Sequence, residues 1–298
     1  MKQKALLLIN ERSRKGKIAA SQARELLMKH GLNFIEPAPC DEAGFSELIE
    51  HHASDVSHVI VGGGDGTLNT CLKGLISTGL PLGILPLGTA NDFARTVGIP
   101  ADLDEAVKII AQGHLRDCDL GLVNDHPFLN VSSIGFSVNL ARNLSEKAKK
   151  RWGVAGYALA ALFLLRQSRP FSATLHADGK VQELTTVQFS VGNGRFYGGG
   201  LAVSHTAAPD DGLLDVYSLE VAHWWQLITL IPYIKRGTQG KLRHVRSFTT
   251  TALSVQTRRP HYINADGEII GCTPARFSLQ QKALRFFAPE TSIVSGKN

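Results

Sequence analysis

Cysteine is scarce in this chain, and the cysteines present form no recognisable cluster. Cys40, Cys71, Cys118 and Cys272 are widely spaced and include no Cys-x-x-Cys pair. Neither a zinc site nor a disulfide framework is therefore indicated, and a reducing compartment, the cytoplasm, is expected.

Long hydrophobic runs are also missing. The most apolar stretch, Val154 to Leu165, has twelve residues, whereas a membrane-spanning helix needs about 20. The short apolar run before Asn10 is too short for the core of a signal peptide and is predicted to be a strand. We therefore expect no transmembrane segment.

Charge of one sign is not concentrated anywhere. The chain has 32 Lys and Arg against 26 Asp and Glu, a formal charge of +6, and no block of like charge exceeds Lys147 to Arg151. This excess favours an anionic partner such as a nucleotide or an anionic membrane surface. No basic motif is interleaved with aromatic residues, so nucleic acid is not expected as a partner.

The 298 residues, of which 43% are hydrophobic, are enough for two domains, and we place them at 1–117 and 118–298. In the first part, strand patterns at 5–9, 32–35, 58–61 and 83–85 alternate with helical patterns near 19–27, 45–49 and 68–75. Such alternation predicts an α/β domain with a parallel sheet, whose ligands collect beyond the carboxyl ends of the strands.

The sequence pattern of the second part is typical of an antiparallel sheet domain. Short alternating segments at 128–131, 173–176, 187–191, 213–219 and 284–287 are separated by turn signals, and Asp178-Gly179 predicts a hairpin. Helical patterns at 154–165 and 224–234 interrupt them. We predict an all-β sandwich, whose last strands could return to the first domain.

The most informative motif is the glycine turn Gly62-Gly63-Gly64-Asp65-Gly66-Thr67, directly after the strand at 58–61. Glycines at a strand end let backbone N–H groups approach a phosphate, and Asp65 beside phosphates would need a bridging cation such as Mg²⁺. Phosphoryl transfer is thus the leading hypothesis. The alternative is a tight turn that needs positive φ angles.

A second motif, Leu87-Gly88-Thr89-Ala90-Asn91-Asp92-Phe93-Ala94-Arg95, follows the next strand. Asn91 or Asp92 could cap the following helix, whose N–H groups would then face the same crevice as Asp65. Plain helix capping is the alternative, and for Asn91 alone it is preferred.

Three further motifs follow in the second part. Asn193 to Gly200 is a glycine-dense loop, which suits a flexible turn and a close backbone approach equally well. The segment Ala208 to Leu213 contains the acidic pair Asp210-Asp211, directly before Gly212. This pair suits either a metal site or a turn, and for this motif taken alone the turn is preferred. Asp266-Gly267-Glu268 places two carboxylates on one face if extended, or forms a hairpin tip.

Together these five motifs, in this order, resemble those of the diacylglycerol kinase-type lipid kinase family. The resemblance runs from Asn10 to about Glu268. It implies a nucleotide-binding domain related to phosphofructokinase and NAD kinase, followed by a β-sandwich domain, with the active site between them. It also implies ATP and Mg²⁺ as cofactors and transfer of the γ-phosphate to a lipid hydroxyl, such as that of diacylglycerol.

The resemblance assigns roles residue by residue. Around ATP it places Asn10, Ser13, Gly16, Gly63, Gly64, Asp65, Gly66, Thr67, Leu68, Asn69 and Thr89. It implies a proton acceptor at Asp266 or Glu268. We assign both of these residues, together with Asp92, as catalytic residues. For a structural magnesium it implies Asp211 and the main-chain carbonyls of Ala208 and Leu213.

Three positions depart from the family pattern. Glu11 stands where the family has proline, Thr70 stands where a glutamate commonly follows the glycine turn, and the adenine-side threonine expected near Ala38 to Cys40 is not identifiable. The Thr70 departure keeps open a second hypothesis, a nucleotide-binding regulatory protein without catalysis. A third is an NAD kinase-like enzyme with a soluble substrate.

A lipid substrate would have to be met at a membrane surface. Val154 to Leu165 with its basic flanks, together with Trp224-Trp225, could form such an interface, and a buried helix is the alternative. We accordingly expect a cytoplasmic protein that meets lipid at the inner membrane surface. The sequence leaves the oligomeric state open, with a homodimer as one alternative.

Overall fold

The structure is a computed structural model that describes residues 4–11, 14–38, 42–138, 169–194, 196–197, 201–202, 208–221, 226 and 244–290. Several predicted features lie outside these residues. They are the helix at 154–165, the helix at 224–234 apart from Gln226, the Trp224-Trp225 pair and Ser13.

The first domain is built on parallel strands in the order β2-β1-β3-β4, which are β2 (Asn33–Ile35), β1 (Lys4–Ile9), β3 (His58–Gly63) and β4 (Leu82–Pro86). The residues of β3 and β4 are buried throughout. Strands that are covered on both faces read as continuous apolar runs, which is why the sequence pattern located them.

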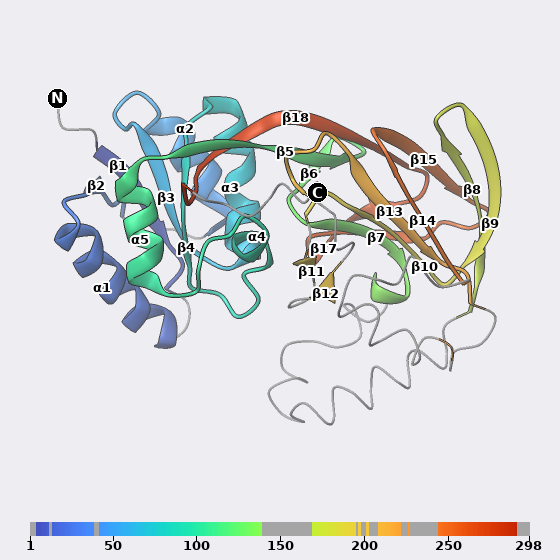
Figure 1. Ribbon diagram of the computed structural model, residues 1–298, viewed down its shortest axis with the longest axis horizontal. Coiled ribbons are helices and arrows are strands. Elements are labelled where there is room, and N and C mark those ends of the chain that lie inside the picture. The colour runs from blue at the N-terminus through green and yellow to red at the C-terminus, as the bar shows by residue number, and fades with distance from the viewer. Residues whose placement is uncertain are drawn as a thin grey trace.

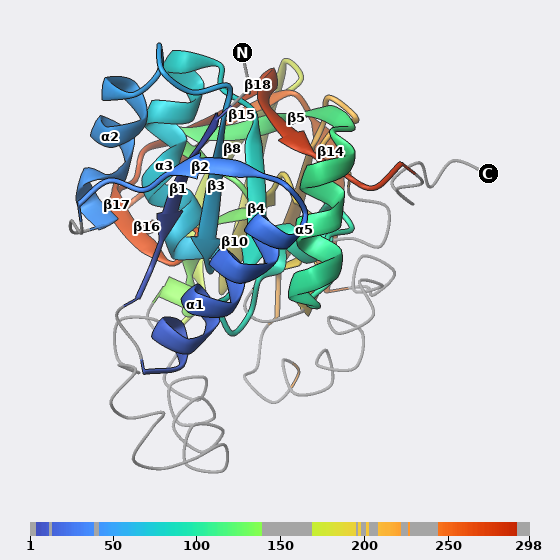
Figure 2. The same ribbon diagram turned by 90° about the vertical axis from the view of Figure 1, so that its left-hand side faces the viewer.

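Helices cover both faces of this sheet. They are α1 (Arg14–Lys29), α2 (Phe45–His51), α3 (Asp65–Thr78), α4 (Asp92–Thr96) and α5 (Leu103–Gln112), with a 3₁₀ turn η1 (Glu42–Gly44) before α2. Viewed from the end of the domain, α1 and α5 lie on one side of the strands, and α2 and α3 on the other (Figure 2). The sequence reading missed α5, although its ends carry clear signals: the Asp102 side chain accepts the N–H of Glu105, and Gly113 ends the helix with φ of 77°.

The second domain pairs a six-stranded antiparallel sheet with the far part of the large sheet. The six-stranded sheet has the order β14-β13-β10-β7-β16-β17. Its strands are β7 (Val131–Gly135), β10 (Gln188–Gly192), β13 (Leu214–Leu219), β14 (Val245–Thr250), β16 (Tyr262–Ala265) and β17 (Glu268–Cys272). Phe189 and Val216 from this sheet join Leu175 and Val255 from the other in one buried cluster, as in a sandwich.

The large sheet runs through both domains. Beyond β4 it continues with β18 (Ala275–Phe287), β15 (Ala252–Thr257), β8 (Phe171–Ala177) and β9 (Lys180–Thr186), while β5 (Leu115–Val123) pairs with β18 and with β6 (His126–Phe128). The long strands β5 and β18 run side by side from one half of the molecule to the other (Figure 1). Each therefore has residues in both hydrophobic clusters, for example Leu284 and Phe277 of β18.

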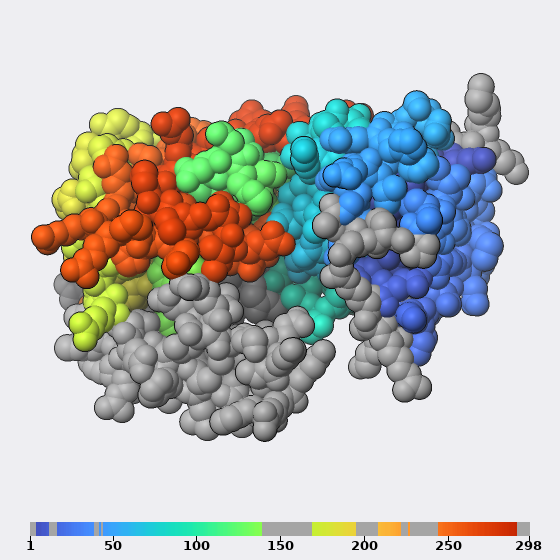
Figure 3. Space-filling model, turned by 180° about the vertical axis from the view of Figure 1, so that it is seen from behind, coloured from blue at the N-terminus to red at the C-terminus, as the bar shows by residue number. Residues whose placement is uncertain are grey.

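The predicted fold class is confirmed: an α/β domain with parallel strands is followed by an antiparallel sandwich. The predicted division at residue 117 stays a prediction. From behind, the orange surface of the second domain abuts the cyan surface of the first (Figure 3). Among the described residues, no helix is long and apolar enough to span a bilayer.

One predicted strand is wrong. The segment Phe128 to Val131 does not continue straight but turns at Leu129-Asn130, between β6 and β7. The backbone N–H groups of Leu129, Asn130 and Val131 all donate to the distant Asp266 carboxylate, so a tertiary contact overrides the local strand pattern. The predicted hairpin at Asp178-Gly179 is confirmed, with positive φ angles at both residues.

Candidate functional site

The glycine turn leaves β3 and enters α3, as its position after a strand predicts. Two of its glycines lie in close contacts: a Cβ on Gly63 would collide with the Thr67 side chain, and a Cβ on Gly64 would meet the Gly88 Cα at 3.2 Å. A Cβ on Gly88 would in turn collide with the Gly64 Cα. The turns after β3 and β4 therefore approach each other at backbone distance, and these glycines are needed for packing within the protein.

Gly66 is different. It lies in the first turn of α3, it is exposed, and nothing lies within 4 Å of the position that its Cβ would take. The amino end of a helix offers backbone N–H groups with no partner inside the helix and a positive partial charge. The open space at Gly66 is thus a place where an anion can approach α3.

Asp65 uses both carboxylate oxygens within the protein. They accept the backbone N–H groups of Asp92 at 3.0 Å and of Phe93 at 2.8 Å, which are the first two amides of α4. The sequence prediction that Asn91 or Asp92 caps this helix is wrong, because the cap comes from Asp65 on the neighbouring turn. Asn91 stands at the N-cap position, but its side chain binds Pro86 and Gly88 of the preceding turn.

The same Asp65 carboxylate reaches the second domain. Its Oδ1 accepts the side-chain N–H of Asn130 at 3.3 Å. Asn130 lies in the turn between β6 and β7 and is only 4% exposed. A glycine turn of the first domain and a turn of the second are thereby joined through one side chain.

Asp266 also binds Asn130. Its carboxylate accepts three backbone N–H groups: that of Leu129 at 2.6 Å and those of Asn130 and Val131 at 3.0 Å. Burial raises the pKa of Asp266 to about 6 against the lowering effect of these three donors, and the charge of Asp65 raises it further.

Asp266 and Gly267 form the two-residue turn of the β16–β17 hairpin, with φ of 46° and 97°. The hairpin alternative from the sequence therefore holds, and the two carboxylates do not share the face of an extended strand. Glu268 begins β17 and is exposed. The two acidic residues thus have different surroundings, one enclosed by donors and one open to solvent.

The predicted nucleotide residues Asn10 and Thr67 meet in a hydrogen-bonded chain. The Asn10 Nδ2 donates to the Thr67 Oγ1 at 3.3 Å, and the Thr67 Oγ1 donates to the Glu42 Oε2 at 3.1 Å. Thr70 turns its hydroxyl back to the Thr67 carbonyl. Glu42, from η1, therefore brings a carboxylate to the glycine turn that no motif had indicated.

The remaining predicted residues lie around these turns. Thr89 is exposed in the turn after β4, Leu68 and Asn69 follow in α3, and the Asn69 Oδ1 is buried without a hydrogen-bond partner. Asp92 is 4% exposed with its carboxylate 3.6 Å from the Arg95 guanidinium. Gly16 lies in α1.

The acidic loop at 208–213 is held by Asp119, a residue that sequence reasoning missed. The buried Asp119 carboxylate accepts the backbone N–H of Gly212 at 2.9 Å and that of Lys282 at 2.8 Å, and its own N–H donates to the Pro209 carbonyl. The Asp211 carboxylate accepts the N–H of Leu213 at 3.0 Å. A carboxylate between Cys118 and Leu120 in an apolar strand is a signal that could have identified Asp119.

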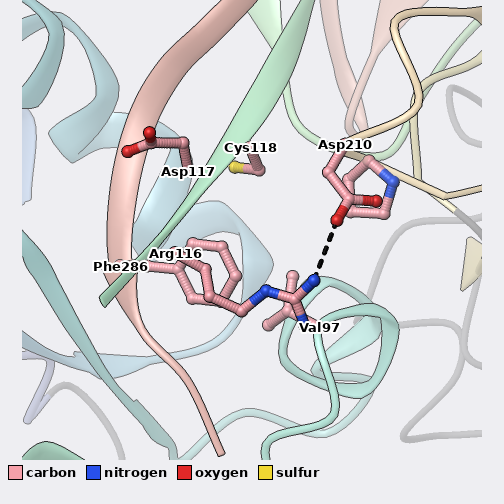
Figure 4. Close-up of a pocket in the computed structure, with 7 residues that line it drawn as sticks. Val97, Arg116, Asp117, Cys118, Asp210 and Phe286 are labelled. Carbon is pink, nitrogen blue, oxygen red and sulfur yellow. Dashed lines mark hydrogen bonds and ion pairs between the residues drawn. The ribbon is translucent and has the colours of Figure 1, made fainter. Parts of the chain in front are cut away.

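A pocket beside this loop contains an ion pair. Arg116 reaches across it to Asp210 at 3.1 Å, with Val97 and Phe286 forming apolar walls (Figure 4). Among the described residues, no group of three or more His, Cys, Asp or Glu side chains is poised to hold a metal. A magnesium site at the loop would therefore depend on main-chain carbonyls together with Asp211.

Asn193 joins the acidic loop to the rest of the site. Its side chain donates to the carbonyls of Asp119 and Leu129, and its backbone N–H donates to the Asn130 carbonyl at 2.9 Å. The structure thus connects Asp65, Asp266 and the loop at 208–213 through Asn130, Asn193 and Asp119. Of these three connecting residues, the sequence reading noted only Asn193, as part of the glycine-dense loop.

Comparison with known proteins places this arrangement in context. Residues 4–123 match the family model of the diacylglycerol kinase catalytic domain, and residues 130–288 match that of the YegS C-terminal NAD kinase beta sandwich-like domain. The chain is 33% identical to a protein of Mycobacterium tuberculosis named "Diacylglycerol kinase", over 91% of this chain and 90% of that one. It is 32% identical to a Pseudomonas putida protein named "Probable lipid kinase YegS-like", over 84% of each.

A solved structure from Bacillus anthracis str. Sterne, provisionally named as a diacylglycerol kinase, has the same fold. Its TM-score is 0.83 at 26% identity, and 98% of each chain is covered. A further relative, an uncharacterized protein of Synechocystis, is 31% identical over 78% of this chain, which spans 55% of that protein.

Proposed function

This chain belongs to the diacylglycerol kinase family of phosphotransferases with an alcohol acceptor, and we propose that it is an ATP- and Mg²⁺-dependent lipid kinase. The proposed reaction transfers the γ-phosphate of ATP to a hydroxyl of a lipid such as diacylglycerol. One observation carries the proposal: Asp65 and Asp266, from different domains, bind the same residue, Asn130, at 3.3 and 3.0 Å. Acidic motifs remote in the sequence therefore converge at the domain boundary.

The nucleotide is proposed to bind over the first turn of α3. The open space at Gly66 supports this, because an anion can reach the helix terminus there without a steric barrier. Bound ATP would supply the phosphoryl group. Asp65, whose oxygens cap α4, is proposed to hold the turns after β3 and β4 in register, and loose phosphoryl-transfer transition states depend strongly on such positioning.

Of the two candidate proton acceptors, Glu268 is proposed to act as the base. The exposed Glu268 can approach a substrate hydroxyl, whereas the Asp266 carboxylate is occupied by three backbone donors. Asp266 is proposed to hold the hairpin turn on which Glu268 stands. Asp92 remains a proposed member of the site through its place at the start of α4.

Mg²⁺ is proposed to bind at the loop 208–213, through Asp211 and the carbonyls of Ala208 and Leu213. One carboxylate and two carbonyls form an all-oxygen donor set, which suits this hard cation. Asp119 holds the loop from beneath through Gly212 and Pro209. The ion would give the loop a fixed shape at the domain boundary.

The direct test is incubation of the protein with labelled ATP, Mg²⁺, NAD and a lipid panel that contains diacylglycerol, monoacylglycerol, ceramide and phosphatidylglycerol. A labelled lipid with the wild type, formed much more slowly with Glu268→Gln, is the expected result. Label in NAD and in no lipid would favour the soluble-substrate alternative. ATP binding without any labelled product would favour the regulatory one.

Lipid at a membrane surface is a separate proposal, because the segments that would form the interface lie outside the described residues. Flotation with liposomes checks it. Binding that increases with anionic lipid content is expected from the net charge of +6. Flotation that does not depend on anionic lipid would contradict the membrane-surface proposal.

A homodimer is also proposed. Sedimentation of the wild-type protein measures its oligomeric state, and a monomer would contradict this proposal.

A further inference from the structure

Asn130 makes an unusual set of contacts for a residue outside every recognised motif. Its backbone N–H donates to Asp266 at 3.0 Å, and its backbone carbonyl accepts the N–H groups of Asn193 at 2.9 Å and Gly194 at 3.1 Å. Its side-chain N–H donates to Asp65 at 3.3 Å. Three of the five motifs therefore meet at this one residue.

The orientation of the Asn130 carboxamide is set by Asp65. The Asn130 Oδ1 is buried and has no hydrogen-bond partner, which is normally unfavourable for a polar atom. Rotating the carboxamide by half a turn would point this oxygen at the Asp65 carboxylate and remove the donor that Asp65 now accepts. The site thus tolerates one unpaired acceptor in order to keep an N–H directed at Asp65.

Asn130 also separates two like charges. Asp65 and Asp266 lie close enough for the charge of Asp65 to raise the pKa of Asp266. Between them Asn130 is a neutral residue that donates one N–H to each carboxylate. A donor placed between two nearby carboxylates offsets part of their repulsion.

We propose that Asn130 is a positioning residue that fixes the glycine turn of the first domain against the Asp266-Gly267-Glu268 turn of the second. Through Asp65 it holds the turn beside which the nucleotide is proposed to bind, and through Asp266 it holds the turn that carries the proposed base. This inference rests on the proposed function for its effect on catalysis. Its structural content, the coupling of the two turns, can be measured without any substrate.

The sharpest variant is Asn130→Asp, which keeps the size of the side chain and replaces the N–H donor by a carboxylate oxygen. Repulsion from Asp65 and Asp266 should separate the two turns. At pH 8 we expect kcat for lipid phosphorylation to fall by roughly 100-fold, the loss typical of small misplacements of reacting groups. The deficit should shrink as the pH falls, because a protonated carboxyl can again donate to Asp65, and this pH profile is not expected for a general loss of stability.

The matched control is Asn124→Asp. Asn124 stands in the exposed turn between β5 and β6, where its carboxamide donates to the Pro274 carbonyl at 3.2 Å and accepts the N–H of Arg276 at 2.8 Å. The same substitution there also removes a donor, but away from both acidic motifs. Asn124→Asp should keep the wild-type kcat and pH profile.

Hydrogen exchange tests the coupling itself. The amides of Asp92 and Phe93 report on Asp65, and those of Leu129 and Val131 report on Asp266. In Asn130→Asp all four should exchange about tenfold faster than in the wild type, and in Asn124→Asp none should change. Unchanged exchange in a folded Asn130→Asp protein would overturn the proposal, whatever happens to kcat.

Gly194→Ala is the second variant, used if Asn130→Asp does not fold. A Cβ at Gly194 would lie 3.1 Å from the Asn130 Oδ1 and 3.3 Å from both the Asn130 Cα and the Leu129 carbonyl oxygen, so it crowds Asn130 and its turn while every hydrogen-bonding group remains. Faster exchange of the same four amides supports the proposal, and unchanged exchange overturns it. A wild type that phosphorylates no alcohol would refute the proposed function alone, because the exchange measurement decides the coupling independently.

Discussion

Gly64 and Gly88 face each other with no side chain between them, so that the turns after β3 and β4 pack backbone against backbone. This contact brings the amino end of α4 within reach of the Asp65 carboxylate, which caps it. The glycines of the turn consequently serve two purposes. Some allow the protein to pack against itself, and Gly66 leaves a space open.

Alanine substitutions should separate these two purposes. In Gly88→Ala the new Cβ would collide with the Gly64 Cα, and because a backbone cannot give way cheaply we expect a loss of about 1–3 kcal/mol in the free energy of unfolding. Urea denaturation measures this. An unchanged midpoint and slope would show that the two turns do not pack as described.

Gly66→Ala should leave the stability of the fold intact and weaken nucleotide binding. Its Cβ meets nothing within 4 Å, and alanine in a helix is favoured over glycine by up to about 1 kcal/mol, so stability should be kept or raised. Nucleotide affinity should fall, because the methyl group occupies the proposed phosphate approach. Calorimetric titration with ATP checks this, and wild-type affinity would move the nucleotide away from the first turn of α3.

Glu268→Gln should lower kcat by roughly 100-fold or more, in the range usual for the loss of a general base, with little change in nucleotide affinity. The exposed position of Glu268 implies that the fold is unaffected. Asp266→Asn should lower both kcat and stability, since one of the backbone donors at 129–131 would face an N–H₂ group. If the two variants lose activity equally without any loss of stability, the separate roles are wrong.

The pKa of Asp266 predicts how stability depends on pH. The folded-state value of about 6 lies above the ordinary value of 3.8, so the folded protein binds this proton more tightly than the unfolded chain does. The free energy of unfolding should therefore gain up to about 3 kcal/mol from this group as the pH falls through 6 towards 4, and lose it as the pH rises.

Urea denaturation of the wild type and Asp266→Asn at several pH values between 4 and 8 isolates this contribution. The wild type should lose stability relative to the variant as the pH rises through 6. A difference between the two proteins that stays constant over the whole range would mean that Asp266 does not titrate there.

Asp119→Ala should destabilise the protein by about 2–4 kcal/mol, because it leaves the N–H groups of Gly212 and Lys282 without their buried acceptor. If the loop at 208–213 binds Mg²⁺ as proposed, the ion should raise the melting temperature of the wild type and do so less in the variant. Thermal unfolding with and without Mg²⁺ measures both effects, and an equal shift in the two proteins would place the ion elsewhere.

The parts of the fold that the sequence predicts are those set by local signals. The strand, glycine turn and helix at 58–78 follow from apolar pattern and turn chemistry within about twenty residues. The cap of α4 does not, because Asp65 reaches it from 27 residues away. The local sequence pattern predicts a cap at Asn91 or Asp92, because it contains only residues that are adjacent to the helix in the sequence.

The connecting residues of the site could not be predicted for the same reason. Asn130 meets Asp266 across 136 residues and Asp65 across 65 residues, and an asparagine between two apolar residues has no distinctive spacing. Asp266 illustrates the reverse case. The sequence identified its motif, but the three backbone donors that distinguish it from Glu268 exist only after β6, β7 and β16 have come together.

The strand β18 has a consequence for how this chain is made. β4 pairs in parallel with β18 at Phe286. The strand next to β4 in the sheet of the first domain therefore comes from residues 275–287, almost two hundred positions downstream. A ribosome must therefore translate the chain through β18 before this edge of the nucleotide-binding half is paired, and until then β4 is an open edge on which another strand can pair.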